Sequence, residues 1–148
     1  MTTNYFLSTV RYEKTMENGL NKTVSEQYLF DALSFTEAEA RTIEELQPYI
    51  SGEFSIPQIV KPRISKLMLS EDMSADRYYK VKVAFIAIDE KNGAVKKANS
   101  FMLVQASDFK SAYERFIEGM KGTMAYYEIV SIVETQILAY YPAKHDEK

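Results

Sequence analysis

The sequence predicts an α+β protein made of two copies of one β-β-α-β unit, with antiparallel sheet of about six strands, two helices and a pseudo-twofold relation between the copies. Shifting the 148-residue chain by 74 residues against itself gives eleven identities between Tyr5 and Glu44, where roughly two or three are expected. Each half also has an Asn-Gly pair between strand-like runs, followed by a helix-like segment. The copies are residues 1–74 and 75–148, packed as one compact domain. The identities pair Tyr5 with Tyr79, Asn18-Gly19 with Asn92-Gly93, Lys22 with Lys96, Leu29 with Leu103, Ala32 with Ala106, Phe35 with Phe109, Ala38 with Ala112, Arg41 with Arg115, Ile43 with Ile117 and Glu44 with Glu118.

A hairpin opens each half. An Asn-Gly pair favours a two-residue primed turn, because both central residues of that turn need positive φ. With such turns, opposed residue numbers sum to 37 in the first hairpin and to 185 in the second. The predicted strand pairs are residues 5–14 with 22–32, around Asn18-Gly19, and residues 78–89 with 96–106, around Asn92-Gly93.

A helix follows each hairpin. Ser34 and Glu37 have the spacing of a capping box, and Asp108 takes the equivalent N-cap position in the second half. The predicted helices are residues 35–47, ended by Pro48, and residues 109–121, which we expect to fray near Gly119 and Gly122. Their apolar spacing places two stripes against the sheet: Phe35, Ala38, Ile43 and Leu46 in the first helix, and Phe109, Ala112, Phe116, Ile117 and Met120 in the second.

A long third strand completes each copy, at residues 53–69 and 126–140. Pro57 and Pro62 cannot donate to a sheet ladder, so we expect the first of these strands to be an edge or bent strand, whereas the unbroken second one could be central. The simplest order within a copy is 2-1-3, all antiparallel, with the helix on one face. The two copies could continue one six-stranded sheet through their third strands or pack face to face.

Composition limits the classes of protein to which the chain can belong. The chain carries a net charge of -3 and has no cysteine, so neither disulfides nor thiolates are available. The basic residues are concentrated in residues 75–148. The N-terminal residues lack the features of a secretion signal, and no apolar run approaches the roughly 20 residues that span a bilayer. We expect a cytoplasmic protein that does not associate with a membrane.

Catalytic motifs are missing from the sequence. The only histidine, His145, lies in a charged tail where solvation is the simplest expectation, and the five glycines form no phosphate-binding loop. Carboxylate pairs such as Glu37 with Glu44, or Asp89 with Glu90, are more typical of solvated helix faces and hairpin tips than of a cation site. We therefore expect no enzyme, no metal and no cofactor.

One sheet face is the candidate binding site. On the face away from the helices, the predicted registers interleave aromatic rings with lysines, as suits a single strand whose bases stack on rings while ammonium groups follow the phosphates. The alternative is that these side chains form the contact between the two halves or between subunits. The expected nucleic-acid-binding residues are Phe6, Tyr12, Lys80, Lys82, Lys97 and Phe101.

Several segments resemble a known but uncharacterised family. The run Leu33-Ser34-Phe35-Thr36-Glu37-Ala38-Glu39-Ala40 is the most specific, and the likeness also includes Arg11-Tyr12-Glu13-Lys14, Tyr49-Ile50-Ser51-Gly52-Glu53-Phe54 and Tyr79-Lys80-Val81-Lys82-Val83. The chain resembles a domain of unknown function found in Bacteroides-group bacteria, their mobile elements and their phages. The resemblance implies a phage or mobile-element setting and supplies no catalytic residues.

Three function classes remain after these observations, of which an enzyme is a distant third. The first is a non-enzymatic accessory protein that binds single-stranded nucleic acid; the acidic balance of the chain and the lack of a recognised nucleic-acid motif weigh against it. The alternative is a protein-interaction module, such as an assembly factor or an inhibitor of a host system, which suits the acidic first half and the eleven tyrosines. Exposed strand edges would also allow a homodimer.

Overall fold

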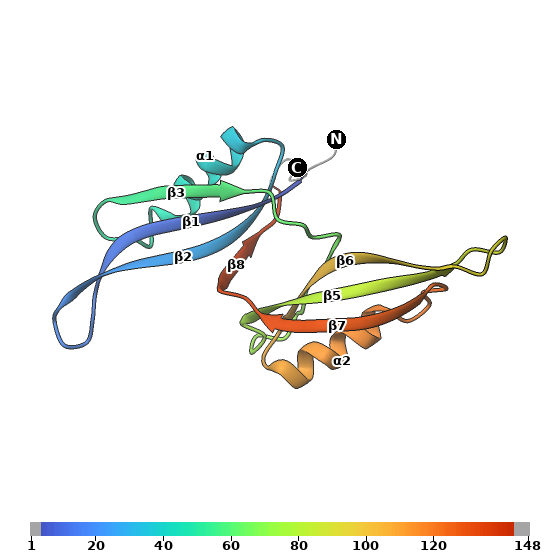
Figure 1. Cartoon of the computed structure of the whole chain (residues 1–148). Coiled ribbons are helices and arrows are strands. Elements are labelled where there is room, and N and C mark those ends of the chain that lie inside the picture. Colours follow the sequence, from blue (N-terminus) through green and yellow to red (C-terminus); the bar gives the residue numbers. More distant parts are fainter. Residues whose placement is uncertain (1–3, 144–148) are drawn as a thin grey trace. The chain divides into compact units, whose positions relative to one another are not determined.

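Both predicted hairpins form, and each is a pair of long strands. The computed structural model describes residues 4–143. The first hairpin joins β1 (Asn4–Thr15) to β2 (Asn21–Ala32), and the second joins β5 (Arg77–Ile88) to β6 (Val95–Ala106) (Figure 1). β1 and β5 are rich in the β-branched and aromatic residues that favour extended structure.

The hairpin turns are longer than predicted. Gly19 and Gly93 have positive φ, but no described residue other than glycine does, which rules out the primed turn. The first loop places three residues between Met16 and Leu20, whose backbones hydrogen-bond. The second places four residues between Asp89 and Ala94.

This difference shifts the register of the second hairpin relative to the first. Asn4 pairs with Ala32, whereas Arg77 pairs with Ala106. Ala32 and Ala106 in the second strands of the two hairpins are 74 residues apart, but their partners Asn4 and Arg77 are only 73 apart. The uniform shift of 74 residues therefore does not hold for the paired first strands, and a shift of one residue moves a side chain to the other face of a sheet.

One helix follows each hairpin, as predicted. They are α1 (Phe35–Leu46) and α2 (Phe109–Gly119). The Ser34 hydroxyl accepts a hydrogen bond from the Glu37 N–H, but the Glu37 carboxylate accepts from the Leu33 N–H instead of from Ser34. A complete capping box occurs in α2, between Asp108 and Ser111.

Each predicted third strand is divided in two. The first region forms β3 (Phe54–Val60) and β4 (Lys66–Met68), and the second forms β7 (Tyr126–Glu134) and β8 (Ile137–Tyr141). The prolines explain the first interruption, since Pro62 has no N–H to continue a ladder. The second region has no proline within it, so the prediction of one unbroken strand was reasonable from its residues but wrong.

Within residues 4–143 the strands form two four-stranded sheets, ordered β3-β1-β2-β8 and β4-β6-β5-β7. The predicted core order, with the first strand between the second and third, is confirmed in both. The pairings within each 2-1-3 unit are antiparallel, as predicted. A single six-stranded sheet is wrong, and so is purely antiparallel sheet, because β8 runs parallel to β2 and β4 runs parallel to β6. β3 is an edge strand as expected, but β7 is also an edge strand, not a central one.

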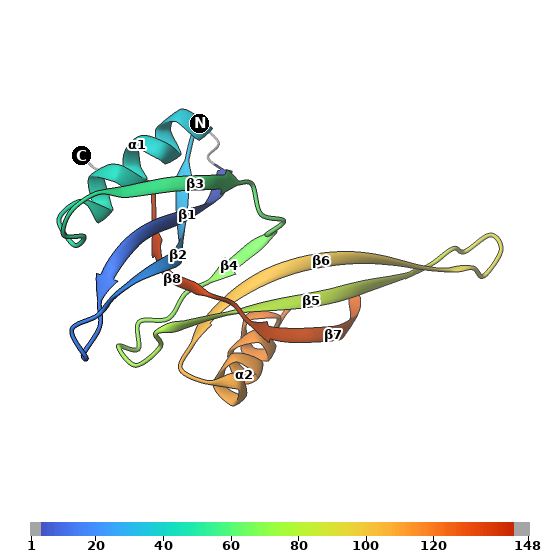
Figure 2. The same ribbon diagram turned by 60° about the vertical axis from the view of Figure 1, so that its left-hand side comes forward.

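The chain divides into two compact units, and each sheet belongs to one of them. The first unit contains the described residues up to Pro62 together with those from Gln136, and the second is Arg63–Thr135. The strand that follows β3 therefore enters the sheet of the second unit, and the strand that follows β7 enters the sheet of the first (Figure 2). Neither added strand is joined to its parallel partner by a tight turn, since such a turn connects antiparallel strands.

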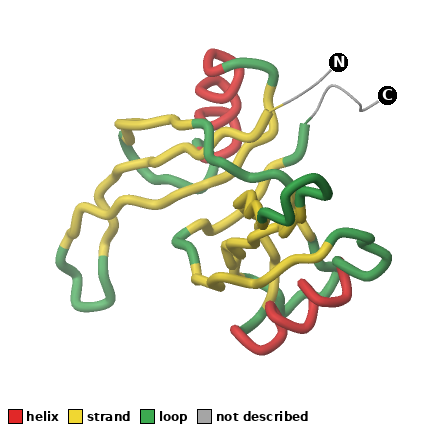
Figure 3. Tube along the Cα trace, turned by 45° about the vertical axis from the view of Figure 1, so that its right-hand side comes forward, coloured by secondary structure: helices red, strands yellow, loops and turns green. Residues whose placement is uncertain are grey.

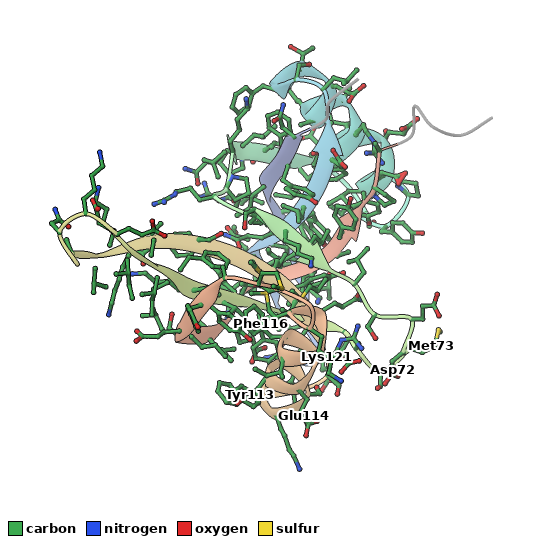
Figure 4. All side chains as sticks on the ribbon, turned by 90° about the vertical axis from the view of Figure 1, so that its right-hand side faces the viewer. Asp72, Met73, Tyr113, Glu114, Phe116 and Lys121 are labelled. Carbon is green, nitrogen blue, oxygen red and sulfur yellow. The ribbon has the colours of Figure 1, made fainter. Side chains whose placement is uncertain are left out.

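A helix covers one face of each sheet (Figure 3). Phe6, Ala32 and Ala38 form a buried cluster between β1, β2 and α1. In the second unit, Phe116 of α2 and Met120, the residue that caps its C-terminus, belong to the apolar core. Figure 4 shows Phe116 on the sheet side of α2, with Tyr113 and Glu114 on the opposite side.

The helix stripes are shifted from the predicted ones. Phe35, Ile43 and Phe109 are exposed instead of buried. In α1 the inward stripe passes instead through Arg41 and Thr42, polar residues that an apolar pattern does not select.

No helix within residues 4–143 is long and apolar enough to cross a membrane. His145, which we expected to be solvated, lies outside the described residues.

Candidate nucleic-acid interface

Four of the six predicted contact residues share one face of the second unit's sheet. Val81 and Val83 of β5 belong to the core with Phe116 of α2. Because side chains alternate along a strand, Lys80 and Lys82 lie on the opposite face. The register places Phe101 across from Lys82 and Lys97 across from Ile86, so these two residues of β6 share that face.

The ring of Phe101 is surrounded by positive charge. The Lys80 ammonium nitrogen lies 4.7 Å from the ring centroid and that of Lys82 lies 6.0 Å from it. The guanidinium carbon of Arg63 lies 4.9 Å from the same centroid. These distances fall within the range of cation–π attraction. Arg63, Lys80, Lys82 and Phe101 are called the cationic cluster below.

Sequence reasoning missed Arg63. The residue precedes β4, whose Lys66 pairs with Met102, and the Ser65 N–H donates to the Phe101 carbonyl at 2.7 Å. This parallel pairing brings Arg63 to a ring 38 residues away in the chain. No local pattern around Arg63 signals the contact.

The cations of the cluster form no ion pair with the described residues. In the part of the chain that the structure describes, the three ion pairs are Arg77–Glu134, Lys97–Glu128 and Lys121–Glu118. None includes a cation of the cluster. Lys97 differs, because its ammonium lies 3.4 Å from the Glu128 carboxylate, which offsets its charge.

A small notch adjoins the Phe101 ring. Its volume is about 230 Å³. Asn99 lies on the same face as Phe101, directly opposite Ala84, whose side chain is only a methyl group. The lining residues are Arg63, Ile64, Ser65, Asn99, Ser100 and Phe101.

Phe6 does not belong to this interface. It is fully buried on the helix side of the other sheet, packed edge-to-face on Phe35 at 4.8 Å between ring centroids. The Lys61 ammonium lies 5.6 Å from its ring, but a ring with no accessible surface cannot stack on a base. The prediction for Phe6 is wrong because it assumed that Phe6 faced away from the helix.

Tyr12 also lies on the helix side of the first sheet. Its hydroxyl donates to Glu26 Oε1 at 3.0 Å, and the Tyr28 hydroxyl donates to the same oxygen at 2.9 Å. Burial and then the hydrogen bond to Glu26 raise the pKa of Tyr12, and the same causes raise that of Tyr28 further. Tyr12 is thus engaged in a phenol–carboxylate network and does not extend the cationic cluster.

An open cleft of about 860 Å³ lies beside Tyr12. It runs between the outer part of the first hairpin and the connection from α1 to β3. Its charged lining residues are Arg11, Glu13, Lys14 and Glu53, two of each sign, so the cleft has no net attraction for an anion.

The carboxylate pairs considered from sequence have structural partners. Glu37 Oε1 accepts from the Leu33 N–H at 2.7 Å, and Asp89 Oδ1 accepts from the Lys91 N–H at 2.8 Å. Within residues 4–143, no three His, Cys, Asp or Glu side chains are grouped closely enough to hold a metal ion.

Comparison with protein families identifies a match over the described residues. A family model described as a domain of unknown function (DUF4494) matches residues 4–143. No curated protein matches the chain significantly.

Proposed function

The chain belongs to this family of unknown function, and we propose that it is a non-enzymatic accessory protein that binds single-stranded nucleic acid. The proposed interface is the sheet face of the second unit that carries the cationic cluster. Lys97 would contribute less, since Glu128 offsets its charge.

The observation that carries this proposal is the convergence of three cations on one aromatic ring, none of them ion-paired with a carboxylate of the described residues. Like charges held close together repel, so such a cluster is costly unless an anion binds it. A nucleic-acid backbone supplies repeated negative charge, and its bases can stack on the ring, each stacked base contributing roughly 1–3 kcal/mol.

Phe101 favours a single strand over a duplex. In a duplex the base faces are covered by neighbouring base pairs, so an aromatic ring gains no stacking surface. In a single strand a base can replace one of the cations above Phe101, and the displaced side chain can then contact a phosphate. Aromatic stacking combined with a positive groove is the usual arrangement for sequence-tolerant single-strand binding.

The resemblance to proteins of Bacteroides-group bacteria, their mobile elements and their phages suggests the setting. We propose that the protein acts in the cytoplasm of such a cell, in the service of a phage or an integrated element. A nucleic-acid accessory role suits that setting, because mobile elements expose single strands when they replicate or transfer.

We also propose that the two halves arose by duplication and are related by a pseudo-twofold axis. The two sheets have matching strand orders once β4 is matched with β8. The buried clusters also correspond when the one-residue difference in hairpin length is allowed for: Phe6, Ala32 and Ala38 in the first unit, and Tyr79, Ala106 and Ala112 in the second.

Fluorescence anisotropy with labelled single-stranded oligonucleotides, repeated over a range of salt concentrations, tests the function. We expect affinity to fall as salt rises, because binding releases counterions from the phosphates. The variant Lys80→Glu/Lys82→Glu should lose most of the binding, and an unlabelled duplex should compete poorly.

A matched control is Lys96→Glu/Lys110→Glu, which changes net charge by the same amount. Lys96 pairs with Ala87 on the helix side of the sheet, and Lys110 lies on α2. We expect this variant to bind as the wild type does. Equal loss in both variants would mean that net charge, not the cationic cluster, governs binding, and that result would reject the proposed face.

A protein-interaction module is the second candidate, and the edge strand β7 favours it. Tyr126, Val130 and Val133 of this strand are each more than half exposed, and an exposed strand edge can pair with a partner strand. Three results together would favour this candidate over the first: the protein retains a protein partner at all salt concentrations, the variant Val130→Lys loses that partner, and no oligonucleotide binds.

A further inference from the structure

We propose that the notch beside Phe101 is a subsite for one nucleobase, with Asn99 as the residue that reads it and adenine as the preferred base. This inference deepens the proposed function and rests on it. It assigns a selective contact to a surface that would otherwise bind through charge and stacking alone.

The walls of the notch supply the groups that a base needs. Phe101 offers a ring face, and Arg63 offers a planar guanidinium that itself can stack on a base. Both residues belong to the second unit.

Asn99 is the free polar side chain of the notch. The Ser65 and Ser100 hydroxyls lie 2.7 Å apart, and the Ser65 hydroxyl also donates to the Phe101 carbonyl at 3.0 Å. The Asn99 amide, by contrast, has no hydrogen-bond partner among the described residues. An amide presents one acceptor and two donors on one planar group.

That amide matches one edge of adenine. The N6 amino group of adenine donates and its N7 accepts, so an asparagine can bond both at once. Guanine presents two acceptors on the corresponding edge, and pyrimidines lack N7. A base held there must displace Arg63 from the ring of Phe101, where its guanidinium carbon lies 4.9 Å from the centroid.

Arg63 is free to make this exchange. Its side chain is exposed and comes from the connection between β3 and β4. Once displaced, the guanidinium can cover the outer face of the base or bond a phosphate bidentately. The contact with Phe101 thus occupies the base position until a strand binds.

Competition between oligo(dA), oligo(dC) and oligo(dT) of equal length tests the subsite. We expect the wild type to bind oligo(dA) about tenfold more tightly than the pyrimidine oligomers. Asn99→Ala should reduce affinity for oligo(dA) to the pyrimidine level while the salt dependence stays unchanged. Asn99→Asp should have at least the same effect, because it replaces the donor with a negative charge.

The control is Asn21→Ala, which removes an exposed strand asparagine from the first unit and should leave base preference unchanged. Thermal unfolding followed by circular dichroism checks that each variant is folded. If the wild type binds all three oligomers equally, or if Asn99→Ala keeps the preference for oligo(dA), the subsite is disproved. Binding that still depends on Lys80 and Lys82 would then leave the proposed function intact, whereas no binding to any oligomer would remove both.

Discussion

The Ser8 hydroxyl lies 2.8 Å from the Thr42 hydroxyl, and both side chains are fully buried between β1 and α1. Thr42 Oγ1 donates to the Ala38 carbonyl at 2.7 Å, so its oxygen accepts the Ser8 proton. The two hydroxyls therefore form a chain that joins the sheet to the helix. Under the proposed duplication, the corresponding positions in the second unit are Val81 and Phe116, both in the apolar core.

The first prediction concerns this pair. Thr42→Val should lower the free energy of unfolding by about 1–3 kcal/mol, because it leaves the buried Ser8 hydroxyl without a partner. Ser8→Ala should cost less, since Thr42 keeps its bond to Ala38. Urea unfolding of both single variants and of the double variant measures the coupling. If the loss of unfolding free energy in the double variant equals or exceeds the sum of the two single losses, the hydrogen-bonded chain is contradicted.

The second prediction is that the first unit loses stability at alkaline pH. Burial, followed by the interaction with Glu26, raises the pKa of Tyr28 above the ordinary value of 10.0, and burial with Asp31 does the same for Tyr140. Such groups bind their protons more tightly when folded, so their contribution is complete below pH 10 and is lost as pH rises above it.

Urea unfolding between pH 8 and about pH 11 checks this sign, since tyrosine ordinarily titrates near pH 10. Tyr28→Phe should flatten the decline, because it removes one titrating group. The control Tyr49→Phe changes a tyrosine that is 83% exposed and should not flatten it. An unfolding free energy that rises above pH 10 would show that the sign is wrong.

The third prediction concerns the start of α2. Asp108→Ala should lower the free energy of unfolding by about 1 kcal/mol, because the Asp108 carboxylate accepts from the Ser111 N–H at 2.8 Å. The same hydrogen bond holds the pKa of Asp108 below its usual range, so its contribution is lost as pH falls below about 4. Asp108→Asn, which retains an acceptor, should recover most of the stability at pH 7 in thermal unfolding. If Asp108→Asn is as unstable as Asp108→Ala, the cap is not the cause.

The fourth prediction is that Met68 limits the gain from replacing Gly119 with alanine. A Cβ at this position would lie 2.7 Å from Met68 Sδ, and Met68 belongs to the core. Glycine to alanine usually stabilises a helix by roughly 1 kcal/mol; because the contact is with the flexible end of the Met68 side chain, which can shift, we expect a smaller gain here. In a Met68→Ala background the same change should give the full gain, and denaturant unfolding of the four proteins measures the difference. Equal effects in both backgrounds would exclude the contact with Met68 as the cause.

The fifth prediction tests charge at the proposed interface. Glu128→Gln should tighten binding of a single-stranded oligonucleotide several-fold, because it removes a carboxylate that lies 3.4 Å from the Lys97 ammonium. Glu114→Gln on α2 is the matched control, since Glu114 lies on the opposite side of the second unit (Figure 4), and it should leave binding nearly unchanged. Weaker binding by Glu128→Gln would mean that Lys97 needs its carboxylate partner to be held in place.

The sequence predicted the hairpins, the helices and the 2-1-3 strand order, because these follow from local preferences. Asn18-Gly19 and Asn92-Gly93 favour turns, and Ser34 and Asp108 favour helix starts, whatever else surrounds them. Loop length is also local, yet Asn-Gly occurs here in loops of three and of four residues. The prediction assumed equal loops, so it aligned the first strands of the two hairpins one residue out of step. This error put Phe6 and Tyr12 on the wrong face and caused the two errors in the candidate site.

The sequence by itself determined that the chain is α+β and which of its segments become hairpins and helices. It also determined that four residues share one face of a sheet, because side chains alternate along paired strands: Lys80, Lys82, Lys97 and Phe101. Only the tertiary structure decided that β4 and β8 join the sheets in parallel, because pairing between distant segments depends on the packing of the whole unit and not on local preference. The same pairing brings Arg63 to Phe101, so the cationic cluster is a consequence of the fold.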